Sequence, residues 1–221
     1  MPVSGYILTV LLAYLLGSIP TGFLVGKARG IDIRTLGSGN IGATNVLRYL
    51  GTVAGVMVLL ADALKGFLAV AGLTRLIWHV FGTTPDPLNR EWLEIAAGLG
   101  AIVGHNFTCW LRFKGGKGIA TSAGVLVALV PYALLIILGV WIIVLALTRY
   151  VSLASICASF TLPFAVWITG GSFTMIAITA AMTALAIYKH KSNMQRLFKG
   201  TETRLGQKPA AARAEAPKTT A

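Results

Sequence analysis

The chain has 221 residues, of which 56% are hydrophobic and only 12% are charged, and its mean hydropathy is +0.76. Because an ordinary soluble domain carries charge on about a quarter of its residues, this composition excludes a soluble globular protein and predicts an all-α integral membrane protein. The net charge of +12 is scattered between apolar runs, with no recognisable nucleic-acid-binding module. Such charge is typical of cytoplasmic loops and of contact with membrane lipids, so we expect no nucleic-acid partner.

The N-terminal stretch argues against a cleaved signal peptide, and the cysteines argue against a disulfide-bonded or zinc-binding protein. Met1–Val25 has no basic stretch before its apolar run and no small-residue cleavage site at its end, so we expect a retained first span. Cys109 and Cys157 form no C-x-x-C pair, which argues against a disulfide framework and a zinc site. No metal-ligand cluster is apparent in the sequence, so we predict no metal, no cofactor and activity in chelator.

The apolar runs are long enough to enter a bilayer, which takes about 20 residues per helix. The run Ile119–Leu147 is too long for one helix and too short for two, and Pro131 interrupts it. Since proline ends or bends a helix, we divide the run at Pro131 and expect its first piece to be short, tilted or only partly spanning. The other runs are Val3–Gly26, Thr52–Phe81, Ile95–Leu111, Ser152–Thr169 and Ser172–Tyr188.

The distribution of basic and acidic residues decides how many times the chain crosses the membrane. Two crossings in the divided run leave all the basic loops and the basic segment from Lys189 on one side, and the acidic segment Asp86–Glu94 on the other. One crossing would export Arg149 and the basic C-terminal segment, against the tendency of positive residues to stay in the cytoplasm. We therefore predict seven transmembrane helices, with the N-terminus outside and the C-terminus cytoplasmic. They form a single domain, residues 1–206, and the composition of residues 207–221 is typical of a disordered tail.

The first candidate binding segment is Gly37–Arg48, GSGNIGATNVLR. Its glycines permit close backbone approach to an anion. The N–H groups of such a loop, and of a helix that starts there, favour phosphate, and Arg48 can point at the same anion. A flexible interfacial loop is the alternative interpretation. The candidate binding residues are Ser38, Gly39, Asn40, Gly42, Thr44 and Asn45.

The second segment is Phe113–Gly118, FKGGKG, directly before an apolar helix. It is not a Walker A loop, because Lys117 is followed by glycine and Leu111 stands where the first glycine would fall, so ATP hydrolysis is not implied. A Gly-Gly turn flanked by lysines still makes an anion cradle in front of a positive helix end. A plain basic loop is an equally open interpretation. The candidate binding residues are Lys114, Gly115, Gly116, Lys117 and Gly118.

The third segment begins at Lys189. If the last helix continues past Tyr188, His190 and Asn193 lie one turn apart on one face. Histidine is the natural candidate for proton transfer, although a solvated interfacial histidine is the alternative. We expect Glu202 to pair with a basic neighbour for structural reasons.

Two charges lie inside the second apolar run. Asp62 and Lys65 are three residues apart, and since an unpaired charge in a membrane is costly, we expect a structural pair. His79, on the opposite side, is expected to be incidental.

Together the three segments supply several cations, two glycine-rich cradles and one titratable base on one side of the bilayer. This combination fits a site for two phosphorylated substrates and favours an enzyme acting on anionic lipids or their precursors. An organic-phosphate transporter would share the cationic loops, although the repeats typical of many transporters are not visible. A non-catalytic membrane scaffold is the third class.

At these residues the chain resembles the bacterial acyl-phosphate:glycerol-3-phosphate acyltransferases, small membrane enzymes that open phospholipid synthesis. The resemblance covers about residues 5–206 and extends to Tyr14–Pro20, Asp62–Gly66 and Tyr150–Ile156. It departs at Thr108, where the family usually has proline. The H-x4-D pattern of other glycerolipid acyltransferases is absent, since Trp110 lies five residues after His105.

The resemblance implies an enzyme of the bacterial inner membrane whose active site faces the cytoplasm. It implies transfer of a fatty acyl group from acyl phosphate to the first hydroxyl of glycerol 3-phosphate, giving lysophosphatidic acid and phosphate, with no obligate protein partner. The important polar side chains on this chain would be Ser38, Arg48, Lys117, Ser155, His190 and Asn193.

An acyl phosphate is a mixed anhydride with a good leaving group, and no Ser-His-Asp or Cys-His arrangement is recognisable in the chain. We therefore expect the protein to position two anions and balance their charge. Ser38, nearby amides and Lys117 are expected to hold the departing phosphate, and Arg48, Ser155, Asn193 and His190 to orient the acceptor. Either His190 or the donor's phosphate takes the hydroxyl proton. The acyl chain is expected in a groove between spans that opens to the bilayer.

Overall fold

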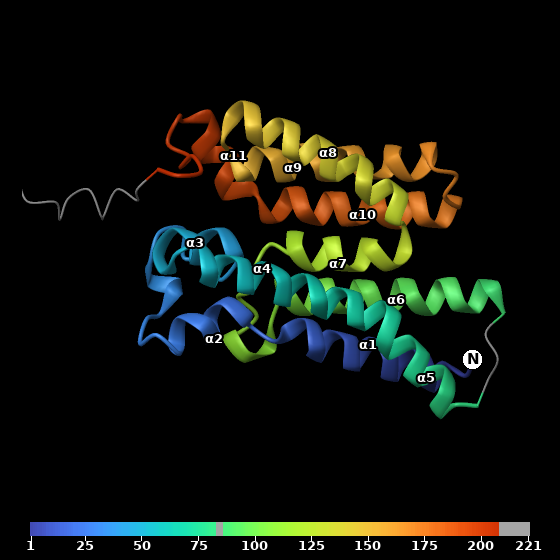
Figure 1. Ribbon diagram of the computed structural model, residues 1–221. Coiled ribbons are helices and arrows are strands. Elements are labelled where there is room, and N and C mark those ends of the chain that lie inside the picture. Colours follow the sequence, from blue (N-terminus) through green and yellow to red (C-terminus); the bar gives the residue numbers. More distant parts are fainter. Residues whose placement is uncertain (83–85, 208–221) are drawn as a thin grey trace, which may run out of the picture.

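The computed structural model of the protein describes residues 1–82 and 86–207, and these residues form helices and no strand (Figure 1). The helices are α1 (Val3–Ser18), α2 (Thr21–Lys27), α3 (Ala43–Leu50), α4 (Thr52–Phe67), α5 (Thr74–Val80), α6 (Pro87–Asn106), α7 (Ile119–Leu129), α8 (Pro131–Thr148), α9 (Val151–Ile168), α10 (Phe173–Lys189) and α11 (Lys191–Phe198). The short helices η1 (Ile33–Thr35), η2 (Leu68–Leu73) and η3 (Cys109–Leu111) connect them. Of the predicted C-terminal tail, residues 208–221 lie outside the described residues.

The long helices form two groups with α7 between them (Figure 1). In one group α1 packs against α6, and in the other α9 packs against both α8 and α10. Helix α4 packs against α7 so closely that a Cβ on Gly124 would lie 1.8 Å from the Ala63 carbonyl oxygen. Small residues allow such close approach of backbones, which is how helices associate in a membrane.

The predicted division at Pro131 is confirmed. Helix α7 ends at Leu129 and α8 begins at Pro131. With 11 residues, α7 is about 16 Å long, about half the thickness of a hydrocarbon core. The first piece of the divided run is therefore short, as expected.

The final helix continues one residue past Tyr188 and then bends at His190. Helix α10 ends at Lys189, α11 starts at Lys191, and their axes differ by 57°. The His190 Nδ1 lies 2.8 Å from the Ala186 carbonyl oxygen. The side chain thus bonds to a carbonyl of the last turn and closes α10.

Within the described residues, four helical stretches are long and apolar enough to cross a bilayer, and the bent pair α10–α11 adds a fifth. The four are Val3–Lys27, Thr52–Val80, Pro131–Thr148 and Val151–Ile168. Helix α6 has 20 residues but begins with a polar, charged turn that includes Arg90 and Glu91. The chain is thus a helical integral membrane protein.

The polar segments gather at one end of the molecule. Helices α2, α3 and α11 lie at that end, whereas α5 and the start of α6 lie at the other (Figure 1). The outer helix α8 is mostly exposed along its apolar length, as at Leu135, Ile143 and Leu147. Such a surface suits contact with lipid tails.

Candidate active site

Two adjoining cavities lie where the three polar segments meet, with volumes of about 350 Å³ and about 140 Å³. Ser38, Asn40 and Lys117 line both. The larger cavity is also lined by Gly115, Tyr188, Lys189, Lys191, Ser192, Gln195 and Arg196. The smaller is also lined by Gly42, Ala43, Thr44, Asn45, Arg48, Leu59, Asp62, His105, Gly118, Ile119, Ala120, Trp141, Val151, Ser152, Ser155, His190, Asn193 and Glu202.

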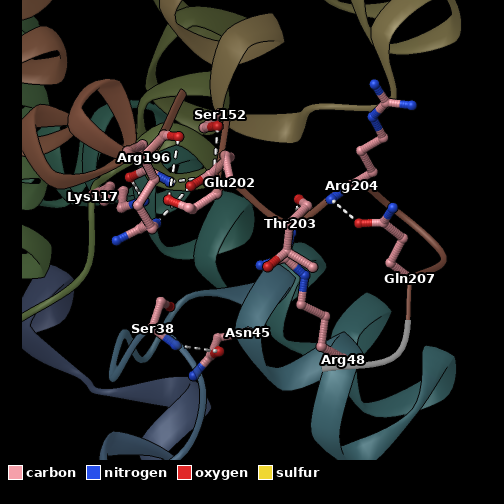
Figure 2. Close-up of polar contacts among 12 residues, drawn as sticks. Ser38, Asn45, Arg48, Lys117, Ser152, Arg196, Glu202, Thr203, Arg204 and Gln207 are labelled. Atoms are coloured by element: carbon pink, nitrogen blue, oxygen red, sulfur yellow. Dashed lines mark hydrogen bonds and ion pairs between the residues drawn. The ribbon is translucent and has the colours of Figure 1, made fainter. Parts of the chain in front are cut away.

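The loop of the first segment is held by its own amide side chains. The buried Asn45 donates from Nδ2 to the carbonyl oxygens of Ile33 (3.2 Å) and Leu36 (3.0 Å), and its Oδ1 accepts from the Ser38 N–H at 3.3 Å (Figure 2). The Asn40 Oδ1 likewise accepts from the Gly42 N–H at 2.8 Å. These two amides therefore shape the loop, which presents Ser38 to both cavities.

The second segment rests on the end of α6. The Gly115 N–H donates to the Asn106 carbonyl oxygen at 3.3 Å, and the Gly116 N–H donates to that of His105 at 3.0 Å. A Cβ on Gly116 would lie 2.0 Å from the His105 Nε2, so only glycine fits there. The turn thus fixes the backbone immediately before Lys117.

Lys117 is the cation common to both cavities. Its Nζ donates to the Asn193 Oδ1. Burial, and then the nearby cations that include Arg196 and Arg48, lower the pKa of Lys117 to about 8. Lys114, on the other side of the glycines, is exposed and lines neither cavity.

Glu202 organises the third segment. Its carboxylate accepts hydrogen bonds from the Ser152 Oγ (2.7 Å), the Asn193 Nδ2 (2.6 Å) and the Arg196 Nε (2.7 Å), as Figure 2 shows. The predicted pairing of Glu202 with a basic neighbour is confirmed. Burial alone would raise the pKa of Glu202, but these hydrogen bonds outweigh it and lower the pKa below its ordinary value.

Arg48 and His190 reach the smaller cavity from opposite segments. The Arg48 Nη2 donates to the Thr203 carbonyl oxygen at 2.8 Å, and its buried Nε has no hydrogen-bond partner among the described residues (Figure 2). His190 lies just after α10, where burial and then Lys117 lower its pKa to about 4. Its imidazole is therefore neutral at pH 7. With Nδ1–H directed to Ala186, Nε2 is free to accept a proton.

Ser155 marks the apolar wall of the smaller cavity. Its Oγ donates to the Val151 carbonyl oxygen at 2.8 Å and accepts from the Trp141 Nε1 at 3.2 Å. Trp141 and Leu59 line the same cavity, and Leu59 is 46% exposed. The cavity wall thus continues into the lipid-facing surface of α4.

The predicted pair of Asp62 and Lys65 is confirmed, with 2.8 Å between Oδ1 and Nζ, and both side chains are buried. Two partners were missed by the sequence analysis. The Thr21 Oγ1 donates to the Asp62 Oδ1 at 2.9 Å, and the His105 Nδ1 lies 3.6 Å from the same oxygen.

Comparison with known proteins decides the family. The sequence model of glycerol-3-phosphate acyltransferases matches residues 7–200. The glycerol-3-phosphate acyltransferase of Geotalea daltonii is 45% identical over 199 residues, which cover 90% of this chain and 97% of that protein. That of Desulforudis audaxviator is 45% identical over 205 residues, covering 92% of this chain and 98% of that protein. The chain belongs to the glycerol-3-phosphate acyltransferase family.

Solved structures of this family have the same fold. The crystal structure of PlsY, an integral membrane glycerol 3-phosphate acyltransferase, in its glycerol 3-phosphate form is 38% identical with a TM-score of 0.80, covering 91% of this chain and 96% of that one. The lysophosphatidic acid form gives a TM-score of 0.78 at the same identity, covering 91% of this chain and 95% of that one. The protein is thus an acyltransferase.

Most of the residues predicted for the acyltransferase site lie together around the two cavities. Three predicted residues line neither of them, namely Gly39, Lys114 and Gly116. Gly116 packs against the His105 ring. Residues that sequence reasoning did not single out include Ser152, Trp141 and Gln195. Ser152 lies in the Tyr150–Ile156 stretch that carried part of the resemblance, so that stretch was the available signal. Across residues 1–82 and 86–207, no group of three or more His, Cys, Asp or Glu could hold a metal ion.

Proposed function

We propose that this acyltransferase uses acyl phosphate as its donor and transfers the acyl group to the sn-1 hydroxyl of glycerol 3-phosphate. The products are lysophosphatidic acid and phosphate. The observation that carries this proposal is the pair of adjoining cavities with Ser38, Asn40 and Lys117 in their common wall. Two phosphate-bearing molecules on either side of one cation would bring their reacting ends together.

The charges around the cavities support the binding of two anions. Two carboxylates line the smaller cavity: Glu202 is paired with Arg196, and Asp62 is paired with Lys65. Arg48 and Lys117 add further positive charge. We assign the departing phosphate to Ser38, the nearby amides and Lys117. Glycerol 3-phosphate would be oriented by Arg48, Ser155, Asn193 and His190.

The reaction needs no covalent intermediate on the protein. The acceptor hydroxyl oxygen attacks the carbonyl carbon, the bond between that carbon and the phosphate oxygen breaks, and phosphate leaves with the electron pair. The hydroxyl proton ends on the phosphate, either directly or through the His190 Nε2. The protein supplies positioning and charge balance, which act most strongly on the developing charge of the transition state.

The charge distribution supports one arrangement in the membrane. We propose seven membrane crossings, an external N-terminus and one domain, residues 1–206, with the cavities facing the cytoplasm of the bacterial inner membrane. The concentration of Lys and Arg around α2, α3 and α11 supports this orientation. Single cysteines introduced at the exposed Lys114 and Lys191 should react with a membrane-impermeant thiol reagent only in inside-out vesicles.

The acyl chain would leave the smaller cavity along Leu59 and Trp141 toward the lipid. Photo-crosslinking with a labelled acyl phosphate should then modify α4 or α8. Labelling confined to the aqueous loops would contradict this path.

Turnover by the purified protein is the decisive test. Phosphate should be released only when acyl phosphate and glycerol 3-phosphate are both present, and chelator should not reduce the rate. Arg48→Ala and His190→Ala should lose most activity while remaining folded. A protein that is folded but inert with both substrates would falsify the proposed donor chemistry. An organic-phosphate transporter would instead move unmodified glycerol phosphate into liposomes.

A further inference from the structure

A buried polar cluster lies directly behind the Gly115–Lys117 turn, and the proposed reaction makes no use of it. It comprises Asp62 and Lys65 of α4, Thr21 of α2 and His105 of α6. His105 is 5% exposed and Asp62 is 2% exposed, yet both contribute to the wall of the smaller cavity. Buried charges in a membrane protein are expensive and commonly serve function.

We infer that His105 is a positioning residue, which Asp62 orients and which holds the glycine turn so that Lys117 meets the phosphate of the substrate. This role rests on the proposed function of Lys117. The backbone provides half of the contact, since the His105 carbonyl oxygen accepts from the Gly116 N–H at 3.0 Å. The ring provides the other half, because the Gly116 Cα packs directly over Nε2 and leaves no room for a Cβ.

The neighbouring residue of α6, Asn106, also supports this loop. The Asn106 carbonyl oxygen accepts from the Gly115 N–H, and a Cβ on Gly118 would lie 2.7 Å from the Asn106 Oδ1. The three glycines of this turn therefore rest on the carbonyl oxygens and side chains of two consecutive residues, His105 and Asn106. A shift of the His105 ring would move this turn, and with it the Lys117 backbone.

The charge pair lies beside the His105 ring, whose buried Nδ1 has no hydrogen-bond partner within the described part of the chain. The Asp62 Oδ1 faces the His105 Nδ1 at 3.6 Å and also accepts from Thr21, while Lys65 donates to the Ile19 carbonyl oxygen at 2.9 Å. These contacts tie the break between α1 and α2 to α4 and α6. The cluster thus joins the membrane-embedded helices to the loop that carries Lys117.

A double-mutant cycle between His105 and Lys117 tests this inference. His105→Ala should lower kcat/KM by about 100-fold, because small displacements of a binding group cost that much. In a Lys117→Ala background the same change should alter kcat/KM by no more than about twofold. Multiplicative losses would overturn the inference, as would an unaffected His105→Ala enzyme. His105→Gln, which fills the space and keeps a polar nitrogen, should recover part of the loss and serves if the alanine variant does not fold.

A second pair of variants tests whether Asp62 orients His105 or only neutralises the charge of Lys65. Asp62→Asn leaves Lys65 buried and unpaired, whereas Asp62→Asn/Lys65→Met removes both charges. We expect the double variant to regain thermal stability but to keep a raised KM, since His105 has lost its anchor. Recovery of both properties would mean that the pair acts only through its charges and would overturn the role of Asp62.

The matched control is His79→Ala. His79 is exposed and belongs to α5, the helix that lies at the opposite end of the molecule, so kcat/KM should not change. Equilibrium binding of radiolabelled glycerol 3-phosphate and of inorganic phosphate gives a readout without donor. Absent wild-type turnover would reject the proposed donor, whereas phosphate binding that is equal in the wild type and in His105→Ala would reject the positioning role.

Discussion

Two polar clusters are buried near the same end of the molecule, and they differ in charge balance. Around Asp62, one carboxylate meets one lysine, and Thr21 and the Ile19 carbonyl take the remaining hydrogen bonds. Around Glu202, one carboxylate faces Arg196 while Lys117 and Arg48 add further cations. Both clusters contribute to the wall of the smaller cavity, but the first has one carboxylate for one lysine, whereas the second has an excess of positive charge. Local charge imbalance, more than the number of polar residues, therefore marks the anion site.

The strongest test of this contrast compares the two lysines that flank the glycine turn. Lys117→Ala removes a partly buried cation shared by both cavities, and kcat/KM should fall on the order of 10²–10³-fold, as for loss of one transition-state donor. Lys114→Ala removes an exposed cation outside the cavities and should leave kcat/KM nearly unchanged. Steady-state phosphate release measures both. Similar losses in the two variants would mean that general surface charge, and not the cavity, attracts the substrates.

Glu202→Gln probes the single carboxylate of the positive cluster. The amide cannot accept all three charge-assisted bonds, so the free energy of unfolding should fall by about 1–3 kcal/mol. Because the pKa of Glu202 is lowered from its ordinary 4.5, the wild-type advantage is full above that pH and is lost as the pH falls through the folded pKa. Thermal unfolding in detergent across pH measures the difference. A difference that stays constant on acidification would contradict the role of the ionised carboxylate.

The pH profile should report Lys117. Its pKa of about 8 means that the amine is protonated at pH 7 and becomes neutral as the pH rises. Only the protonated form attracts phosphate, so kcat/KM should fall about tenfold per pH unit on the alkaline side. Lys117→Arg should abolish this alkaline limb, since a guanidinium stays charged throughout. An unchanged limb in that variant would assign the titration to another group.

Features that depend on neighbouring residues in the chain could be predicted from the sequence, whereas features that depend on the tertiary fold could not. The break at Pro131 was predictable because proline acts on its own backbone, whereas the break at His190 depends on a side chain that bonds to the Ala186 carbonyl oxygen. Lys114 and Lys117 look equivalent in FKGGKG. Their difference arises only when the glycines pack on α6, which leaves Lys114 exposed and places Lys117, partly buried, in the walls of both cavities. Likewise, the Asp62–Lys65 pair follows from spacing within a helix, but the approach of His105 needs the tertiary fold.

The smallest effect on turnover is expected from changes in the packing of helices away from the polar clusters. On Gly100 of α6 a Cβ would lie 3.0 Å from the Val10 carbonyl oxygen of α1, whereas Gly139 of α8 has no atom within 4 Å. Gly100→Val should therefore force α1 and α6 apart and reduce the free energy of unfolding by about 1–3 kcal/mol. Gly139→Val, on the lipid-facing helix, should leave the unfolding midpoint unchanged. Below the midpoint, both variants should keep kcat/KM within about twofold of the wild type, as expected for sites with no shared partners. A large kinetic loss in Gly100→Val would show that packing of α1 on α6 reaches His105 and the loop that it supports.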